Sequence, residues 1–180
     1  KIRGEGSIGL ISSRLVLEGP IKKGNSSFLV SGRRTYLDIL MQPFIASAAA
    51  STGRSVTAGY FFYDLNAKVN TNLGLKDKLF LSGYFGKDKL YNSEKYLGRS
   101  SEFGIFWGNT TGTLRWNHLF NNKIFGNASF IYSNYNFQVK VEESMPFSEA
   151  RFLSGIRDFV FKYDLDYRPN PNHYFRVGIN

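Results

Sequence analysis

The stretch that decides the fold is GYFFYDLNAKVN, residues 59–70. Its odd positions are apolar or small, and from Asp64 onward its even positions are polar: Asp64, Asn66, Lys68 and Asn70. Side chains on a β-strand point alternately to the two faces of the sheet, so this segment has one apolar and one polar face. A helix would distribute the same residues around its circumference. The pattern therefore predicts a long β-strand.

The same alternation returns about a hundred residues later, at 159–167. There the odd positions are apolar or aromatic, and the polar positions between them include Lys162, Asp164 and Asp166. Reading outward from these two segments predicts eight strands, at about 7–18, 27–38, 56–72, 78–88, 102–119, 124–141, 151–168 and 173–180. Several are as long as, or longer than, the roughly 9–11 residues with which a tilted strand crosses a bilayer.

The connections predicted between these strands alternate in length. Longer loops are expected at 39–55, 89–101 and 142–150, and short turns rich in Gly, Asn, Asp and Pro at 19–26, 73–77, 120–123 and 169–172. No amphipathic helix is predicted; Ala46–Ala50 is expected to form one turn inside a loop at most. Outer-membrane β-barrels have short periplasmic turns and longer extracellular loops, so the long loops are expected outside the cell.

Two strands show a change of phase in their alternation. Apolar residues move from odd to even positions across 108–112, and from even to odd positions between Tyr132 and Tyr135. A β-bulge would keep such a strand's faces consistent, so a bulge is predicted at each place.

Composition favours a membrane barrel over a soluble β-sandwich. The 180 residues include 17 Phe and 11 Tyr, and many of these rings lie near the predicted strand ends, as in the aromatic girdles of outer-membrane barrels. The net charge of +9 is scattered in short runs, which does not favour a nucleic-acid partner. The absence of Cys excludes disulfides and Cys-ligated metals, and no run of about 20 apolar residues predicts a spanning helix.

The sequence shows little catalytic chemistry. Its two histidines, His118 and His173, each lie near a predicted turn, where a surface role is the commoner one. Glu142 and Glu143 are neighbours on a strand and face opposite ways, which prevents a shared-proton pair. We therefore expect no enzyme activity, no metal site and no cofactor.

The segment at residues 6–38 carries a more specific signal. It reads GSIGLISSRL, then LEGPIKKG, then SFLVSGRRTYLD, and resembles the start of the barrel in TonB-dependent outer-membrane receptors of Gram-negative bacteria that carry a carboxypeptidase-regulatory-like extension. The run DYRPNPNH at residues 166–173 is similar to a periplasmic turn of those barrels. The resemblance implies an all-β, antiparallel transmembrane β-barrel of about 22 strands. It also implies a plug domain and energised uptake of iron chelates, vitamins or glycans.

On this interpretation residues 1–180 form one partial barrel domain, without the plug and the remaining strands. The alternation and the resemblance together predict side chains that face the lumen or the plug: Arg33, Arg34, Asp64, Asn66, Lys68, Lys162, Asp164 and Asp166. The opposite face, with Phe61, Tyr63, Leu65, Phe159, Phe161 and Tyr163, is expected to meet lipid. The implied partners are outer-membrane lipid and lipopolysaccharide, the plug, the other strands, TonB through an N-terminal segment, and a surface lipoprotein.

Two other classes fit the same strands. A complete eight-stranded outer-membrane barrel would have a structural or adhesive role, because eight strands can close around their own side chains. A soluble carrier barrel would place its apolar face inside and stay in solution without detergent.

Overall fold

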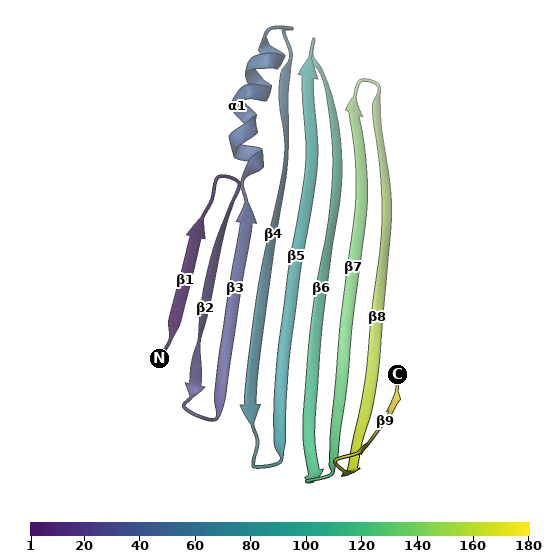
Figure 1. Cartoon of the computed structure of the whole chain (residues 1–180). Coiled ribbons are helices and arrows are strands. Elements are labelled where there is room, and N and C mark those ends of the chain that lie inside the picture. The colour runs from purple at the N-terminus through teal and green to yellow at the C-terminus, as the bar shows by residue number, and fades with distance from the viewer.

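The protein is one antiparallel sheet of nine strands with a single helix, in a computed structural model that describes residues 1–180 (Figure 1). The elements are β1 (Arg3–Ile8), β2 (Ser12–Lys22), β3 (Ser26–Thr35), α1 (Leu37–Ala50), β4 (Ser55–Asn72), β5 (Asp77–Tyr96), β6 (Arg99–Asn121), β7 (Ile124–Ser144), β8 (Phe147–Asn170) and β9 (His173–Ile179). Each strand pairs with its neighbours in the chain. The predicted all-β, antiparallel class is confirmed. The helix does not combine the length and the apolar character that crossing a membrane requires.

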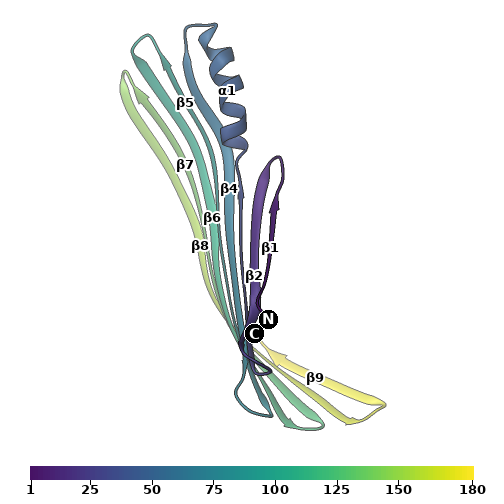
Figure 2. The same ribbon diagram turned by 90° about the vertical axis from the view of Figure 1, so that its left-hand side faces the viewer.

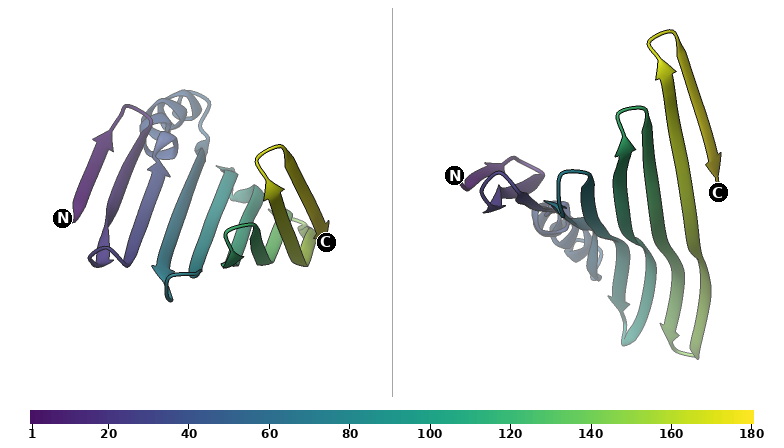
Figure 3. Two further views of the ribbon diagram at one scale, coloured as in Figure 1. Left: turned by 60° about the horizontal axis from the view of Figure 1, so that its bottom comes forward. Right: turned by 90° about the horizontal axis from the view of Figure 1, so that it is seen from below.

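The sheet is open. β1 and β9 are its two edges and lie at opposite ends of it (Figure 3). Only 8 of the 180 residues are buried, so the sheet is a single layer without a core of its own. The nine strands therefore do not form the closed eight-stranded barrel considered above. The ninth strand arises because the predicted strand 7–18 divides into β1 and β2 around a turn at residues 9–11.

The strands β4 to β8 are long, and they bend part-way along their length (Figure 2). β6 has 23 residues and β8 has 24, about twice what a bilayer crossing requires. The predicted loops at 89–101 and 142–150 are wrong, because these residues continue the strands. β5 and β6 meet in a two-residue turn, Leu97-Gly98, whose φ angles of 47° and 76° are those of a tight hairpin. We refer to the end of the sheet with the turns after β2, β4, β6 and β8 as the lower end.

The third predicted loop, 39–55, mostly forms α1, a helix of 14 residues. The prediction of a single helical turn there is wrong. α1 lies beside the upper part of β4, which extends beyond the end of β3 (Figure 1). The Gln42 side chain occupies the place of a missing strand: its Nε2 donates to the Val56 carbonyl at 3.1 Å, and its Oε1 accepts from the Ala58 amide at 3.3 Å. α1 thus covers a strand edge that would otherwise be free to pair with another chain.

The strand register is continuous through the middle of the sheet. The pairing of β6 with β7 runs without a shift from Ser101 and Glu143 to Leu119 and Phe125. Register shifts occur only beside the lower turns, at Pro20/Lys22, Leu119/Asn121 and Tyr167/Asn170. Both predicted bulges are therefore wrong. Because alternation continues without a slip, the apolar residues change from one face of the sheet to the other.

Directly paired residues share a face, so the register defines two faces. Face A carries a transverse row in the lower half of the sheet whose members are all apolar: Val69, Leu81, Leu114, Phe130 and Phe161. Face B carries an all-apolar row in the upper half: Tyr60, Leu90, Ile105, Val139 and Phe152. The apolar residues move from face A to face B near one row of face A, which we call the boundary row. The boundary row consists of Arg34, Tyr63, Lys87, Gly108, Asn136 and Gly155.

Candidate functional site

The polar wall is the lower half of face B. Seven of the eight predicted lumen-facing residues lie on this face by register: Arg33, Asp64, Asn66, Lys68, Lys162, Asp164 and Asp166. Arg34 does not. As the strand neighbour of Arg33 it points to face A, opposite Tyr63, where its guanidinium lies 5.3 Å from the centre of the Phe61 ring. Adjacent strand residues cannot share a face, so the prediction could hold for only one of the two arginines.

Arg33 and Asp64 form the first charged cluster of the polar wall. They are direct register partners on β3 and β4. Arg33 Nε donates to Asp64 Oδ2 at 2.8 Å, and the guanidinium also lies 4.7 Å from the centre of the Phe62 ring. Asp64 is 9% exposed. The ion pair therefore joins two neighbouring strands near the level at which the apolar residues change face.

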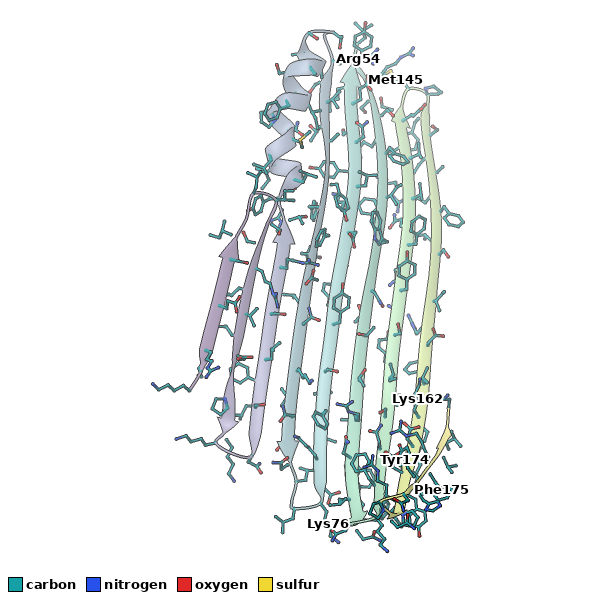
Figure 4. All side chains as sticks on the ribbon, in the orientation of Figure 1. Arg54, Lys76, Met145, Lys162, Tyr174 and Phe175 are labelled. Carbon is teal, nitrogen blue, oxygen red and sulfur yellow. The ribbon has the colours of Figure 1, made fainter.

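The second charged cluster lies at the other end of the sheet, on β8 and β9. Asp166 accepts two hydrogen bonds from Arg176, at 2.6 and 3.0 Å, and one from the Tyr174 hydroxyl at 2.6 Å. Lys162 lies above this cluster on β8, opposite Ser129 of β7, and Figure 4 shows it above Tyr174. Arg–carboxylate pairs of this bidentate kind are among the stronger hydrogen-bonded contacts in proteins. The cluster thus ties the short strand β9 to β8.

The structure does not bring these two clusters together. β4 and β8 are separated by β5, β6 and β7. Neighbouring strands lie about 4.8 Å apart, so four spacings give roughly 19 Å, measured across the strands, between the strand of Asp64 and the strand of Asp166. The predicted residues are therefore parts of an extended polar surface and not one compact site.

The middle of the polar wall holds residues that the sequence reasoning missed. Asn109, Asn117 and Asn127 each have a side-chain oxygen that is buried and has no hydrogen-bond partner, and Arg115 has such a nitrogen at Nε. The Arg115 guanidinium lies 4.5 Å from the centre of the Phe80 ring. Polar residues at every odd position from Asn109 to Asn117 were a visible signal. The assumption of a bulge across 108–112 concealed it. Polar atoms of this kind require water or another polar surface to satisfy them.

The upper half of face B is aromatic and apolar. Tyr60 and Trp107 are stacked with ring centres 6.1 Å apart, and the Tyr60 hydroxyl donates to Asp88 Oδ1 at 2.6 Å. Burial raises the pKa of Tyr60 to about 12, and the neighbouring Asp88 carboxylate contributes in the same direction. Tyr60 therefore remains neutral and continues to donate to Asp88 at all physiological pH values.

The structure contains no group of three or more His, Cys, Asp or Glu side chains that could hold a metal ion. His118 Nδ1 lies 2.6 Å from Asp77 Oδ1, and Trp116 Nε1 donates to the same oxygen at 2.9 Å. The hydrogen bond with His118, followed by the weaker effect of the bond from Trp116, lowers the pKa of Asp77, which lies at the start of β5 beside the turn from β4. His173 contacts Asn170 at 2.8 Å. Each histidine thus has a local structural partner in a turn region.

Comparison with solved structures relates the sheet to outer-membrane proteins. The ferric yersiniabactin uptake receptor FyuA from Yersinia pestis matches 89% of this chain with a TM-score of 0.50 and 7% identity. This chain covers 26% of that receptor, about a quarter of its length. A major outer membrane protein from Thermus thermophilus matches 98% of this chain and 97% of its own, with a TM-score of 0.33 and 8% identity. No family model and no curated protein sequence matches. The fold is that of the wall of an outer-membrane β-barrel.

Proposed function

We propose that this chain is part of the barrel wall of a TonB-dependent receptor, which imports a large nutrient such as an iron chelate, a vitamin or a glycan across the outer membrane. The observation that carries the proposal is the likeness of the open, long-stranded sheet to about a quarter of an uptake receptor. The sequence resemblance of residues 6–38 to the barrel start of these receptors supports it independently. No covalent chemistry is part of the proposed activity.

The two halves of the sheet fit such a role. In the lower half, the exposed apolar residues of face A would meet lipid, and the polar wall of face B would line the lumen. Its unpartnered atoms on Asn109, Arg115, Asn117 and Asn127 would be satisfied by water or by a plug domain. The free edges of β1 and β9 would pair with further strands of a larger barrel.

In the upper half the apolar surface faces the other way. The row of Tyr60, Leu90, Ile105, Val139 and Phe152 would line the mouth of the barrel, above the bilayer. Aromatic and aliphatic walls with a few polar groups are typical of binding sites for organic molecules. The proposed nutrient would meet this wall before it reaches the polar lumen.

The test is energised uptake by cells that express the protein containing residues 1–180. Labelled ferric chelates, a corrinoid vitamin and oligosaccharides are supplied with and without a protonophore, and in a strain that lacks TonB. We expect one class to bind under all conditions, and to enter only when both the proton-motive force and TonB are present. Uptake that continues without TonB, or cells that bind none of the three classes, would reject the proposal.

A further inference from the structure

A groove crosses face A where the boundary row runs through the sheet. Its volume is about 760 Å³. Two glycines of the boundary row, Gly108 and Gly155, contribute to its lining, and Phe85 and Phe106 lie in the same lining. Neither glycine has a side chain that could fill this space, and a larger residue is disfavoured at Gly108 because a Cβ there would lie 2.7 Å from the Gly86 carbonyl oxygen.

The groove is positively charged. Lys87 and Lys89 line it from β5, and both point to face A. Lys87 Nζ lies 5.6 Å from the centre of the Phe85 ring, and Lys89 Nζ lies 5.4 Å from that of Phe106. Neither lysine forms an ion pair. The one acidic residue of the lining, Asp88, alternates to face B and accepts the Tyr60 hydrogen bond there.

One further cation extends this charge along the upper edge of the exposed apolar surface of face A. Arg157, opposite Asn134, lies next to the boundary row on β8. Arg34 belongs to the boundary row, but its charge is paired with the Asp38 carboxylate at 3.8 Å. Below them face A is apolar, and its residues are exposed: Leu81 by 56%, Leu114 by 44% and Phe161 by 53%. Cations directly above an exposed apolar surface match a molecule that has an anionic head and hydrocarbon chains.

We propose that this groove binds the phosphate headgroup of a membrane lipid whose acyl chains lie on the apolar row of face A. Lys87 and Lys89 would contact the phosphate, since a lysine ammonium is a compact point charge suited to that group. The aromatic rings of Phe85 and Phe106 would hold the junction between the headgroup and the chains. The inference rests on the proposed function only in placing face A of the lower half against lipid.

The test uses the full-length protein that contains these residues, extracted from the membrane in dodecylmaltoside. A bisphosphorylated glycolipid with six acyl chains is titrated, and the bound lipid is counted by native mass spectrometry. Replacing both lysines with glutamine (K87Q/K89Q) is expected to weaken binding at least tenfold, while K87R/K89R retains it. The matched control K23Q/K123Q removes the same charge from two lower turns and should bind as the parent does.

Equal affinity of K87Q/K89Q and K23Q/K123Q would overturn the inference. Inorganic phosphate serves as the second probe: displacement of the lipid by phosphate at a similar concentration would identify a free-phosphate site and reject the lipid. Far-UV circular dichroism verifies that each variant is folded. If K87Q/K89Q is not folded, the single variants K87Q and K89Q replace it, and binding by both at the parent's affinity would overturn the inference. If the parent protein shows energised uptake but binds no lipid at the groove, only this inference is rejected. If the parent protein binds the lipid but shows no energised uptake, only the transport proposal is rejected.

Discussion

The two tryptophans report on the two faces separately. Trp116 lies on face A in the lower half, and Trp107 lies on face B in the upper half, stacked against Tyr60. We expect lipids with brominated acyl chains to quench Trp116 strongly and Trp107 weakly, because in the proposed barrel only face A of the lower half meets hydrocarbon. Fluorescence of the W107F and W116F variants in brominated vesicles measures each residue alone. Equal quenching of both would contradict the assignment of the faces.

Neighbouring residues on β8 test the same assignment energetically. Phe161 belongs to the apolar row of face A, and Lys162 to the polar wall. Phe161→Arg should lower the free energy of unfolding by about 2–4 kcal/mol, the cost of an arginine near the bilayer midplane, and Lys162→Arg should change it little. Urea titration of the protein in lipid vesicles measures both. A Phe161→Arg variant as stable as the parent would place that face away from lipid.

Two glycines on β6 differ in how closely other atoms pack against them. A Cβ on Gly108 would lie 2.7 Å from the Gly86 carbonyl oxygen, whereas a Cβ on Gly112 would meet nothing within 4 Å. Gly108→Ala should therefore cost about 1–3 kcal/mol because the strands must move apart, and Gly112→Ala should remain within about 0.5 kcal/mol of the parent. The same urea titration applies. Similar values for the two variants would show that the sheet yields easily at Gly108.

At the scale of elements, α1 is expected to protect the upper edge of β4. Gln42→Ala removes both hydrogen bonds to the strand, at Val56 and Ala58, so the Ala58 amide should exchange faster with solvent. Hydrogen exchange followed by mass spectrometry on a peptide spanning 55–62 measures this. Ser47→Ala changes an exposed residue of the same helix and is the control. Unchanged exchange in Gln42→Ala would mean that the helix covers the edge without these bonds.

The elements differ in how far the sequence could predict them. The lower halves were predictable, because Phe159 to Tyr167 alternate without interruption and the turns at 73–77 and 120–123 carry clear turn residues. The upper halves were mistaken for loops and bulges, because their apolar residues lie on the opposite face and break a pattern read from one face only. α1 was missed for another reason. Its pairing with the edge of β4 is a tertiary contact that Pro43 and the Ala-rich run do not disclose.

The candidate site, like the elements, could be predicted from the sequence only in part. Alternation placed Asp64, Asn66 and Lys68 on one face, and the register confirms that they share it. It could not decide between Arg33 and Arg34, since a one-residue difference in register exchanges the faces. Whether the polar wall contacts a plug stays a prediction.

At the scale of the whole molecule, the direction of the barrel remains a prediction that labelling can test. The chain has no Cys, so a single Cys at Ser51, beside the upper end of α1, or at Asn172, in the turn between β8 and β9, reports one end each. We expect an impermeant thiol reagent to label intact cells at Ser51→Cys and at Ser93→Cys, but not at Asn121→Cys or Asn172→Cys. Exclusive labelling of the lower pair would reverse the orientation.

The length of the strands above the boundary row has a practical consequence. At about 3.3 Å per residue the 24 residues of β8 extend roughly 79 Å, whereas the apolar band of an outer-membrane barrel is about 25 Å tall. A detergent micelle would surround only the lower part of the molecule and leave a hydrated stem above it. Antibodies could bind that stem, and crystal contacts could form through it. We therefore expect the protein to crystallise well in detergents that form small micelles.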